Sequence, residues 1–403
     1  MLRYITEWFK SLYSVWRREF TLVFKDVGVL IFFLFLPTVY PIIYTLIYNP
    51  EIVVELPVVV VDHCATTRSR EFIREVDATQ AIDITGRAAS LSEAREAMNE
   101  HKVYAIMEIP SDFDRQIGRG EQAVIPVYYD MGLLLRYRTI LMALSDLQIA
   151  VGAQLRGEVL ENIGLPAEGM SGTPINSEAE FLGDRTQGFA SFVIPGILIL
   201  ILQQSLVLGI AMLSGGSAER RRRNMGYDPM EIDAPPTATL IGKTLCYTVI
   251  YLPMVLYLFI GVPHIFSLPH DGDYVHYLLF ILPLITASFF MGIMLGTLIK
   301  ERESSLIVLV FTSVIFIFLS GLTWPRYGMS PFWRAVGGLV PATWGVQGFT
   351  RMNSNGATLG QESESYIALW CLTAFYFVIS YLIVRYRRAR QRRLQWAVKQ
   401  SEQ

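Results

Sequence analysis

A chain of 403 residues that is 52% hydrophobic and only 17% charged is too apolar for an ordinary soluble protein, and this composition predicts a membrane protein with several spans. The formal net charge of -2 conceals a pattern, because basic residues gather beside apolar runs while acidic ones lie mostly between residues 51 and 184. Membrane topology accounts for this placement of arginine, which argues against nucleic acid as a partner. Three cysteines do not make a disulfide framework.

The first 26 residues have apolar side chains at helical spacing, with charges spread between them. This pattern predicts an amphipathic helix in the cytoplasmic membrane interface, with a buried soluble helix as the alternative. Residues 27–48 are the first predicted span, in which Pro37 and Pro41 predict a bend. The run is too long for the apolar part of a signal peptide, so no cleavage is expected.

From residue 49 to residue 188 the periodicity changes. Short β-branched runs such as LPVVVVD and KVYAIMEIP alternate with helical patterns such as SLSEAREAMNE, in which Ser90 and Glu93 predict a capping box. This alternation predicts an α/β domain inserted between two spans. Residues 133–160 have helical spacing but carry several charges, so we expect them to stay in water. Residues 163–176, rich in Gly, Pro and Ser, predict a linker.

Residues 189–213 carry no charge, and about 20 apolar helical residues suffice to cross a bilayer. Four consecutive arginines follow, at positions 220–223. Because positive charge beside a span is retained in the cytoplasm, this second span is expected to end there, with residues 49–188 outside the cell membrane. Residues 214–237 then form a cytoplasmic loop that is long enough to carry a short helix and to dock onto a soluble partner.

Four further spans are predicted at residues 238–262, 277–299, 304–323 and 365–384, followed by a basic cytoplasmic tail at 385–403. Residues 324–364 are aromatic but interrupted by Gly and Pro, which predicts a short helix pair that dips into the outer interface. The expected fold is therefore an α-helical polytopic membrane protein with six transmembrane helices, an inserted extracytoplasmic α/β domain and both termini in the cytoplasm.

No catalytic, cofactor or metal site is expected on this chain. Gly242, Lys243 and Thr244 resemble the end of a phosphate-binding loop, but Thr237 stands where that loop needs its first glycine. We therefore interpret Lys243 as a lysine that extends to the cytoplasmic end of a span. Gln203 and Gln204 lie midway along the second span, where they are expected either to hydrogen-bond between helices or to line a substrate path.

Four segments in this order resemble the ABC-2 type permeases of ATP-driven exporters, in the branch with a large extracytoplasmic domain between the first two spans. They are the amphipathic helix before LPTVYP, the segment LPVVVVD with KVYAIMEIPSDF, the span FVIPGILILILQQSLVLG, and SGLTWPRYGMSPFWRAVGGLVPATWGVQG. The resemblance implies a bacterial cytoplasmic (inner) membrane protein that pairs with a second permease copy or a paralogue. It also implies a separate cytoplasmic ABC ATPase subunit that holds ATP and Mg, and it suggests a periplasmic adaptor protein.

The resemblance assigns three groups of residues. The residues that it assigns to contact with the ATPase, and so to coupling, are Trp8, Trp16, Glu219, Arg220, Arg221, Arg222, Arg223 and Asp228. The wall of the translocation path falls to Pro195, Gln203 and Gln204, and the outer gate to Trp324, Pro325, Pro331, Trp333, Pro341 and Trp344. The expected function is export of an amphipathic or lipid-like substrate. The alternatives are a membrane-anchored extracytoplasmic receptor or secretion scaffold without transport, and a membrane enzyme, for which no site constellation is present.

Overall fold

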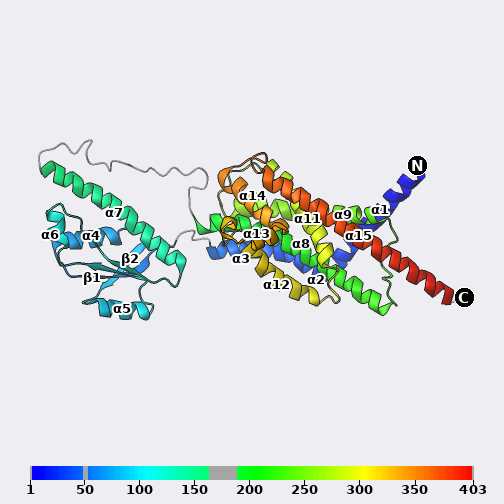
Figure 1. The fold of residues 1–403 in the computed structure, drawn as a ribbon, viewed down its shortest axis with the longest axis horizontal. Coiled ribbons are helices and arrows are strands. Elements are labelled where there is room, and N and C mark those ends of the chain that lie inside the picture. Colours follow the sequence, from blue (N-terminus) through cyan, green and yellow to red (C-terminus); the bar gives the residue numbers. More distant parts are fainter. Residues whose placement is uncertain (1, 49–52, 163–187, 402–403) are drawn as a thin grey trace. The chain divides into compact units, whose positions relative to one another are not determined.

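The computed structural model describes residues 2–48, 53–162 and 188–401 (Figure 1). The chain forms two compact units: a helical unit of Met1–Glu51 with Phe181–Gln403, and an α/β unit of Ile52–Glu180. Helix dominates the described residues, with one small sheet. The predicted linker at 163–176 lies outside the described residues.

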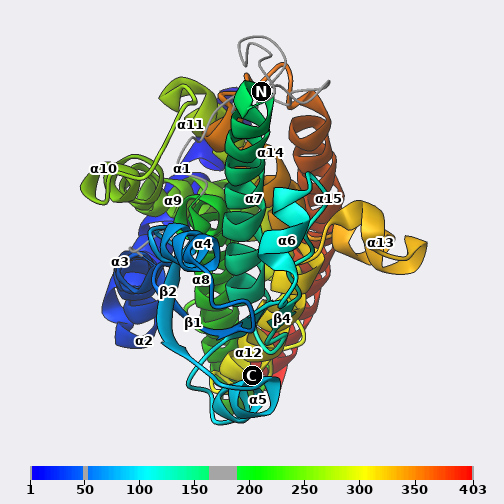
Figure 2. The ribbon, with the colours of Figure 1, turned by 90° about the vertical axis from the view of Figure 1, so that its left-hand side faces the viewer.

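The α/β unit is built on a four-stranded sheet of order β2-β1-β3-β4, in which the first three strands are parallel and β4 is antiparallel to β3. Alternate residues of β1 point to opposite faces, so Val58 and Val60 pack beneath α4, α6 and α7, while Val59 and Val61 pack on α5 (Figures 1 and 2). The elements are β1 (Leu56–Asp62), α4 (Thr67–Asp77), β2 (Ile82–Arg87), α5 (Leu91–Asn99), β3 (Ala105–Ile109), α6 (Phe113–Gly118), β4 (Val127–Tyr129) and α7 (Leu134–Asn162).

The predicted capping box begins α5, with a small difference. The Ser90 hydroxyl accepts a hydrogen bond from the Glu93 amide at 3.3 Å, as expected. The Glu93 carboxylate, however, accepts from the amide of Ala89 at 2.8 Å, one residue before the expected donor.

The helical unit begins with α1 (Leu2–Lys25) and continues into an apolar stretch of three joined segments, α2 (Val27–Leu30), the π-helical η1 (Ile31–Phe35) and α3 (Leu36–Tyr48). After the α/β unit come α8 (Phe189–Arg223), α9 (Pro236–Leu256), η2 (Tyr257–Gly261), α10 (Val262–Ile265), α11 (Tyr274–Leu295), α12 (Ser304–Leu319), η3 (Arg326–Gly328), α13 (Pro331–Gly338), α14 (Pro341–Asn355) and α15 (Ser363–Ser401). The segment expected as an outer helix pair thus contains α13 and α14.

Within the described residues, five helices are long and apolar enough to cross a membrane: Val27–Tyr48, Phe189–Arg223, Pro236–Ile265, Tyr274–Leu295 and Ser363–Arg393. The fifth predicted span, at 304–323, forms the shorter α12, whose 16 residues extend over about 24 Å. This helix ends at Leu319 because Ser320 and Gly321 follow it, and Gly321 adopts a positive φ of 91° that ends a right-handed helix.

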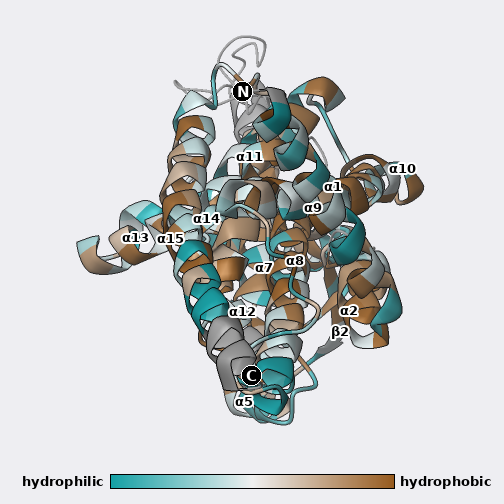
Figure 3. Ribbon diagram, turned by 90° about the vertical axis from the view of Figure 1, so that its right-hand side faces the viewer, coloured by the Kyte–Doolittle hydropathy of each residue, from teal (hydrophilic) through white to brown (hydrophobic). Residues whose placement is uncertain are grey.

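Two predicted spans continue as helix well beyond the apolar run. Helix α8 runs on to Arg223, so the predicted loop of 214–237 is irregular only after that residue. Helix α15 likewise continues beyond the apolar run at 365–384, and its residues 385–393, six of them arginines, make it hydrophilic there (Figure 3). Helix α8 is also the centre of the helical unit, since its apolar window is 94% buried while that of Val27–Tyr48 is 22% buried.

Gly209 lets α8 pack against the fully buried ring of Phe33 in η1. A Cβ atom at Gly209 would lie 1.7 Å from Cε1 of Phe33. At Gly216 on the same helix, the nearest atom to an added Cβ is the Arg220 guanidinium, at 3.5 Å. These two glycines therefore form a matched pair for testing the packing of the helical unit.

We expect Gly209→Ala to destabilise the protein by about 1–3 kcal/mol because of overpacking. Gly216→Ala should leave stability unchanged or raise it, by up to about 1 kcal/mol, because alanine favours helix. Thermal unfolding of the purified protein in detergent measures both. Equal unfolding temperatures for the two variants would contradict the packing of Phe33 on α8.

Candidate functional site

Charged side chains gather at one end of the helical unit, which we call the basic end. It carries residues 220–223 at the end of α8 and the arginines of α15, and both chain termini lie at this end (Figures 1 and 3). Residues 224–235 connect α8 to α9 there, and we call them the basic-end loop.

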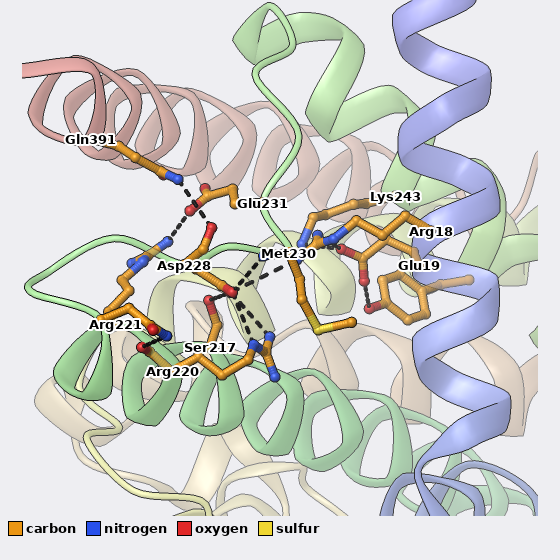
Figure 4. Close-up of polar contacts among 12 residues, drawn as sticks. Arg18, Glu19, Ser217, Arg220, Arg221, Asp228, Met230, Glu231, Lys243 and Gln391 are labelled. Atoms are coloured by element: carbon orange, nitrogen blue, oxygen red, sulfur yellow. Dashed lines mark hydrogen bonds and ion pairs between the residues drawn. The ribbon is translucent and has the colours of Figure 1, made fainter. Parts of the chain in front are cut away.

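Asp228 anchors the basic-end loop to α8 (Figure 4). Its carboxylate accepts hydrogen bonds from Arg220 Nε at 2.9 Å and Nη2 at 3.0 Å, from the Ser217 hydroxyl at 2.7 Å and from the Met230 amide at 3.0 Å. The side chain is fully buried. Burial opposes its ionisation, but the donors from Arg220 and Ser217 outweigh it and hold the Asp228 pKa below its usual range. Asp228 and Arg220 therefore form a buried ion pair with two hydrogen bonds, which holds the basic-end loop against α8.

The next two arginines of α8 also form ion pairs within the chain, the first half-buried and the second exposed. Arg221 binds Glu231 at 2.6 Å, and Arg222 binds Glu301 at 2.9 Å. The Glu219 carboxylate accepts the Arg302 amide at 2.8 Å, which ties α8 to the corner between α11 and α12. Arg223 is exposed, as Arg222 is, but it has no ion-pair partner among the described residues. Three of the four arginines thus hold this chain together.

Helix α15 closes the basic-end loop from the other side. The Asp233 carboxylate pairs with Arg388 and Arg392, each at 2.7 Å, and the Gln391 amide donates to the Asp228 carbonyl at 3.3 Å. The hydrogen bonds from Arg392, and those from Arg388, hold the Asp233 pKa below its usual range. These contacts are more exposed than those of Asp228, so they contribute less to stability.

A buried carboxylate on α1 joins the same group of charges. Glu19, 1% exposed, accepts from Lys243 Nζ at 2.6 Å, Arg18 Nη1 at 3.0 Å and the Tyr247 hydroxyl at 3.0 Å. Burial opposes its ionisation, yet the charges of Lys243 and Arg18 keep the Glu19 pKa below its usual value. Arg18 also lies 3.8 Å from Asp228, so the two carboxylates share one cation. Lys243 therefore binds the buried carboxylate of α1. The sequence alone predicts a lysine that extends to the cytoplasmic end of a span.

Seven residues join α1, α8, the basic-end loop and α9, and because they couple these four segments we call them the coupling cluster: Arg18, Glu19, Ser217, Arg220, Asp228, Lys243 and Tyr247. Among these residues, the resemblance assigns Arg220 and Asp228 to ATPase coupling, whereas Glu19 is not singled out and Lys243 is interpreted only as a lysine at the end of a span. A signal for Glu19 was present, because it lies on the helix face of Val15 and Val23, which are both buried. An acidic residue on that apolar face requires a buried cation.

Trp8 and Trp16 pack α1 within the unit. The Trp8 indole donates to the Thr237 hydroxyl at 3.1 Å, and the Trp16 ring stacks on Phe20 with centroids 5.3 Å apart. Both side chains are half-buried, so neither is a free surface residue. The exposed apolar side chains of α1 are others: Tyr4, Ile5, Phe9, Tyr13 and Phe24.

Gln203 links the middle of α8 to the beginning of α14. Its buried Oε1 accepts the amide of Ala342 at 2.6 Å and the Ser288 hydroxyl at 3.5 Å. Ala342 directly follows Pro341 at the first turn of α14, where backbone amides lack partners in the helix itself. Gln204 is buried too, but neither polar atom of its side chain has a hydrogen-bond partner in the described structure.

The expected gate residues lie in different surroundings. The Trp344 indole donates to the Gly338 carbonyl at 2.9 Å, and the Arg326 guanidinium lies 4.5 Å from the centre of the Trp344 ring. Trp324 and Trp333 are more than half exposed. Pro325, Pro331 and Pro341 stand at the starts of η3, α13 and α14, and Pro195 is buried inside α8. Among η3, α13 and α14, only α14 is joined to the centre of α8 by a side-chain hydrogen bond in the described structure. That bond runs from the Ala342 amide to Gln203.

The two glutamines make a second matched pair. Replacing Gln203 by leucine leaves the Ala342 amide buried without an acceptor, and we expect it to cost about 1–3 kcal/mol. Gln204→Leu removes two polar atoms that have no partner, so stability should stay the same or rise. Unfolding in detergent distinguishes the two variants. A Gln203→Leu protein as stable as Gln204→Leu would contradict the link between α8 and α14.

Comparison with known proteins agrees with this architecture. A comparison with curated proteins gave no match. The family model described as ABC-2 family transporter protein matches residues 27–382, which begin with the first apolar helix and end within α15. Together with five helices long and apolar enough to cross a membrane, this match shows that the chain is a multi-pass membrane protein of the ABC-2 transporter family.

Proposed function

We propose that this chain is the permease subunit of an ATP-driven exporter that moves an amphipathic or lipid-like substrate out across a bacterial cytoplasmic membrane. The match to the ABC-2 transporter family supports the permease role. The proposed orientation places the basic end and both termini in the cytoplasm, because arginines beside spans are retained there. The α/β unit is then extracytoplasmic.

The coupling cluster is the observation that carries this proposal. It joins α1, α8, the basic-end loop and α9 through buried charges, and α15 is bound to the same loop. A force applied at the basic end therefore reaches several helices at once. Helix α8 then runs through the centre of the unit and holds α14 through Gln203. Movement that starts beside a cytoplasmic partner could in this way reach the proposed outer gate.

The ATPase contact is proposed for exposed residues beside the coupling cluster. Met225 is 82% exposed in the basic-end loop, Arg223 is exposed at the end of α8, and Tyr4 and Phe9 are exposed on α1. Because Arg220, Arg221 and Arg222 are paired inside the chain, they act by holding this surface in shape. ATP and Mg would bind the separate ATPase subunit.

In this proposal the lipid-like substrate moves along α8. Gln204 offers a buried donor and acceptor without partners, which a substrate headgroup or a second permease copy could satisfy. A periplasmic adaptor would bind the α/β unit.

One observation supports the alternative of a receptor or scaffold. In the α/β unit, α7 exposes several apolar side chains, including Leu134 at 71%, Ile149 at 66% and Met142 at 51%. An exposed apolar helix face is typical of a protein-binding surface. A receptor would use this face without any dependence on ATP.

Transport in reconstituted vesicles tests the proposal. The chain and its ATPase are placed in lipid vesicles with a fluorescent short-chain phospholipid, and the loss of label from one leaflet is followed with and without ATP. The exporter predicts ATP-dependent movement of this lipid and none of a hydrophilic sugar. Stimulation of ATP hydrolysis by sugars but not by amphiphiles would overturn the lipid-like substrate.

A further inference from the structure

A second feature of the basic end is a cavity of about 610 Å³ between the end of α8, the corner between α11 and α12, and α15. Five of its lining residues are cationic: Arg221, Arg222, Lys300, Arg387 and Arg390. None of the described residues that line it is acidic.

Two of these five cations are neutralised from outside the cavity. Arg221 is paired with Glu231 and Arg222 with Glu301. Lys300, Arg387 and Arg390 form no ion pair with any residue that the structure describes. Three cations without an ion-pair partner among the described residues therefore line one concave site, and a bound anion would be attracted to all of them. A ligand with negative charge fits this site.

The rest of the lining includes polar side chains and a group of aliphatic ones, Ile299, Leu382 and Ile383. Ile299 precedes the corner, and Leu382 and Ile383 lie on α15 in the apolar run at 365–384, whereas Arg387 and Arg390 follow that run. From Leu382 to Arg390 is about 12 Å along the helix axis. The cavity thus has an apolar part beside the span and a cationic part farther along α15, which is the polarity of a phospholipid. Basic pockets between spans on the cytoplasmic side bind anionic headgroups in general.

We propose that this cavity binds the phosphate of an anionic phospholipid from the cytoplasmic leaflet, with Lys300, Arg387 and Arg390 around the headgroup and the acyl chains along Leu382 and Ile383. Arginine suits this role because its planar fork binds phosphate oxygens in pairs. This proposal rests on the proposed function in one respect only: the orientation proposed there decides that the lipid comes from the cytoplasmic leaflet. A soluble phosphate compound has the same anionic chemistry, so the test must separate the two sources.

A ligand bound in this cavity would affect the helices around it, because residues of the lining also hold the basic-end loop. Arg221 lines the cavity and also binds Glu231 of the basic-end loop, while Arg387 and Arg390 belong to α15. A bound headgroup would draw α15 and α8 together beside the coupling cluster. The stability of the protein should therefore depend on the anionic lipid content of its surroundings.

Lipid binding to the purified full chain in neutral detergent tests the site. Phosphatidylglycerol, phosphatidylcholine with the same acyl chains, and inorganic phosphate are added separately, and bound lipid is counted by native mass spectrometry beside the unfolding temperature. We expect phosphatidylglycerol to bind and to raise the unfolding temperature more than phosphatidylcholine does. Equal effects of the two lipids, or equal protection by inorganic phosphate, would overturn the proposal.

Variants on one helix locate the binding. R387Q/R390Q should bind phosphatidylglycerol about thirtyfold more weakly, the loss expected for two cationic contacts. R385Q/R393Q removes two exposed charges from the same helix outside the cavity lining and should bind as the original does. An equal loss in both variants would show non-specific attraction and overturn the site.

Lys300→Gln, on the corner between α11 and α12, provides an independent variant if R387Q/R390Q does not fold. It should weaken binding about fivefold, and unchanged binding would count against the proposal. The assay contains no ATPase and measures no transport, so its result does not depend on whether the exporter proposal holds.

Discussion

Replacing Lys243 by methionine is expected to destabilise the helical unit by about 3–5 kcal/mol, because the carboxylate of Glu19 stays buried after losing its closest cation. Arg18 is then the one cation left on Glu19 among the described residues, and it also lies 3.8 Å from Asp228, which Arg220 binds. The measurement is the free energy of unfolding of the purified protein in detergent. Lys10→Met, at an exposed lysine of α1 without an ion-pair partner among the described residues, is the matched control and should change stability by no more than about 0.5 kcal/mol.

The double variant E19Q/K243M identifies the origin of that loss. Removing both charges leaves no uncompensated buried ion, so we expect it to recover much of the stability lost in K243M. A double variant that is no more stable than K243M would show that Glu19 and Lys243 do not act as a pair.

The second large effect is expected at Asp228. Asp228→Ala leaves Arg220 without its buried partner and the Ser217 hydroxyl without its acceptor, which costs about 3 kcal/mol. The basic-end loop should then detach from α8, and amide hydrogen exchange in residues 224–235 should rise about a hundredfold. Asp233→Ala is the control within the same loop. Its carboxylate is 53% exposed, so exchange should rise by no more than about fivefold.

The same anchor predicts how the loop responds to pH. The Asp228 pKa lies below its usual range in the folded protein, so the ion pair stabilises the loop fully at pH values above about 4. This contribution is lost as the pH falls further, through the folded pKa. Protection of residues 224–235 should therefore stay constant from neutral pH down to about 4 and then decline, and D228N should show only the smaller decline that comes from Asp233. Opening of the wild-type loop between pH 7 and 5 would contradict the assignment.

The sequence predicted the first span with the same bounds as the structure, because residues 27–48 are uninterrupted by charge and flanked by polar residues. It also predicted the alternating strands and helices between β1 and α7, since the change of hydrophobic period is local information. Helix ends were less predictable. The apolar run ends at Leu213 and a loop was predicted from residue 214, but the helix continues to Arg223. A Cβ at Gly215 would lie 2.9 Å from the Arg302 backbone, so Gly215 allows close packing within that helix.

The coupling cluster could be predicted only in part. The arginines at 220–223 indicated the basic end, but nothing in the sequence showed that three of them would be paired within the chain. Glu19 and Tyr247 are 228 positions apart, and their contact follows from how α1 packs on α9. Single-sequence patterns report burial and charge along one element, and the partner across a helix interface is set by tertiary packing.

The most direct test of the coupling role is to purify the chain from its native membrane in mild detergent and to assay the nucleotide hydrolysis that accompanies it. We predict a co-purifying ATPase whose activity falls in D228A, while D233A retains it, with both variants inserted and the ATPase still bound. Absence of any nucleotide-hydrolysing partner under conditions that preserve membrane complexes, or full activity in D228A, would contradict the exporter with its coupling cluster and favour the receptor or scaffold.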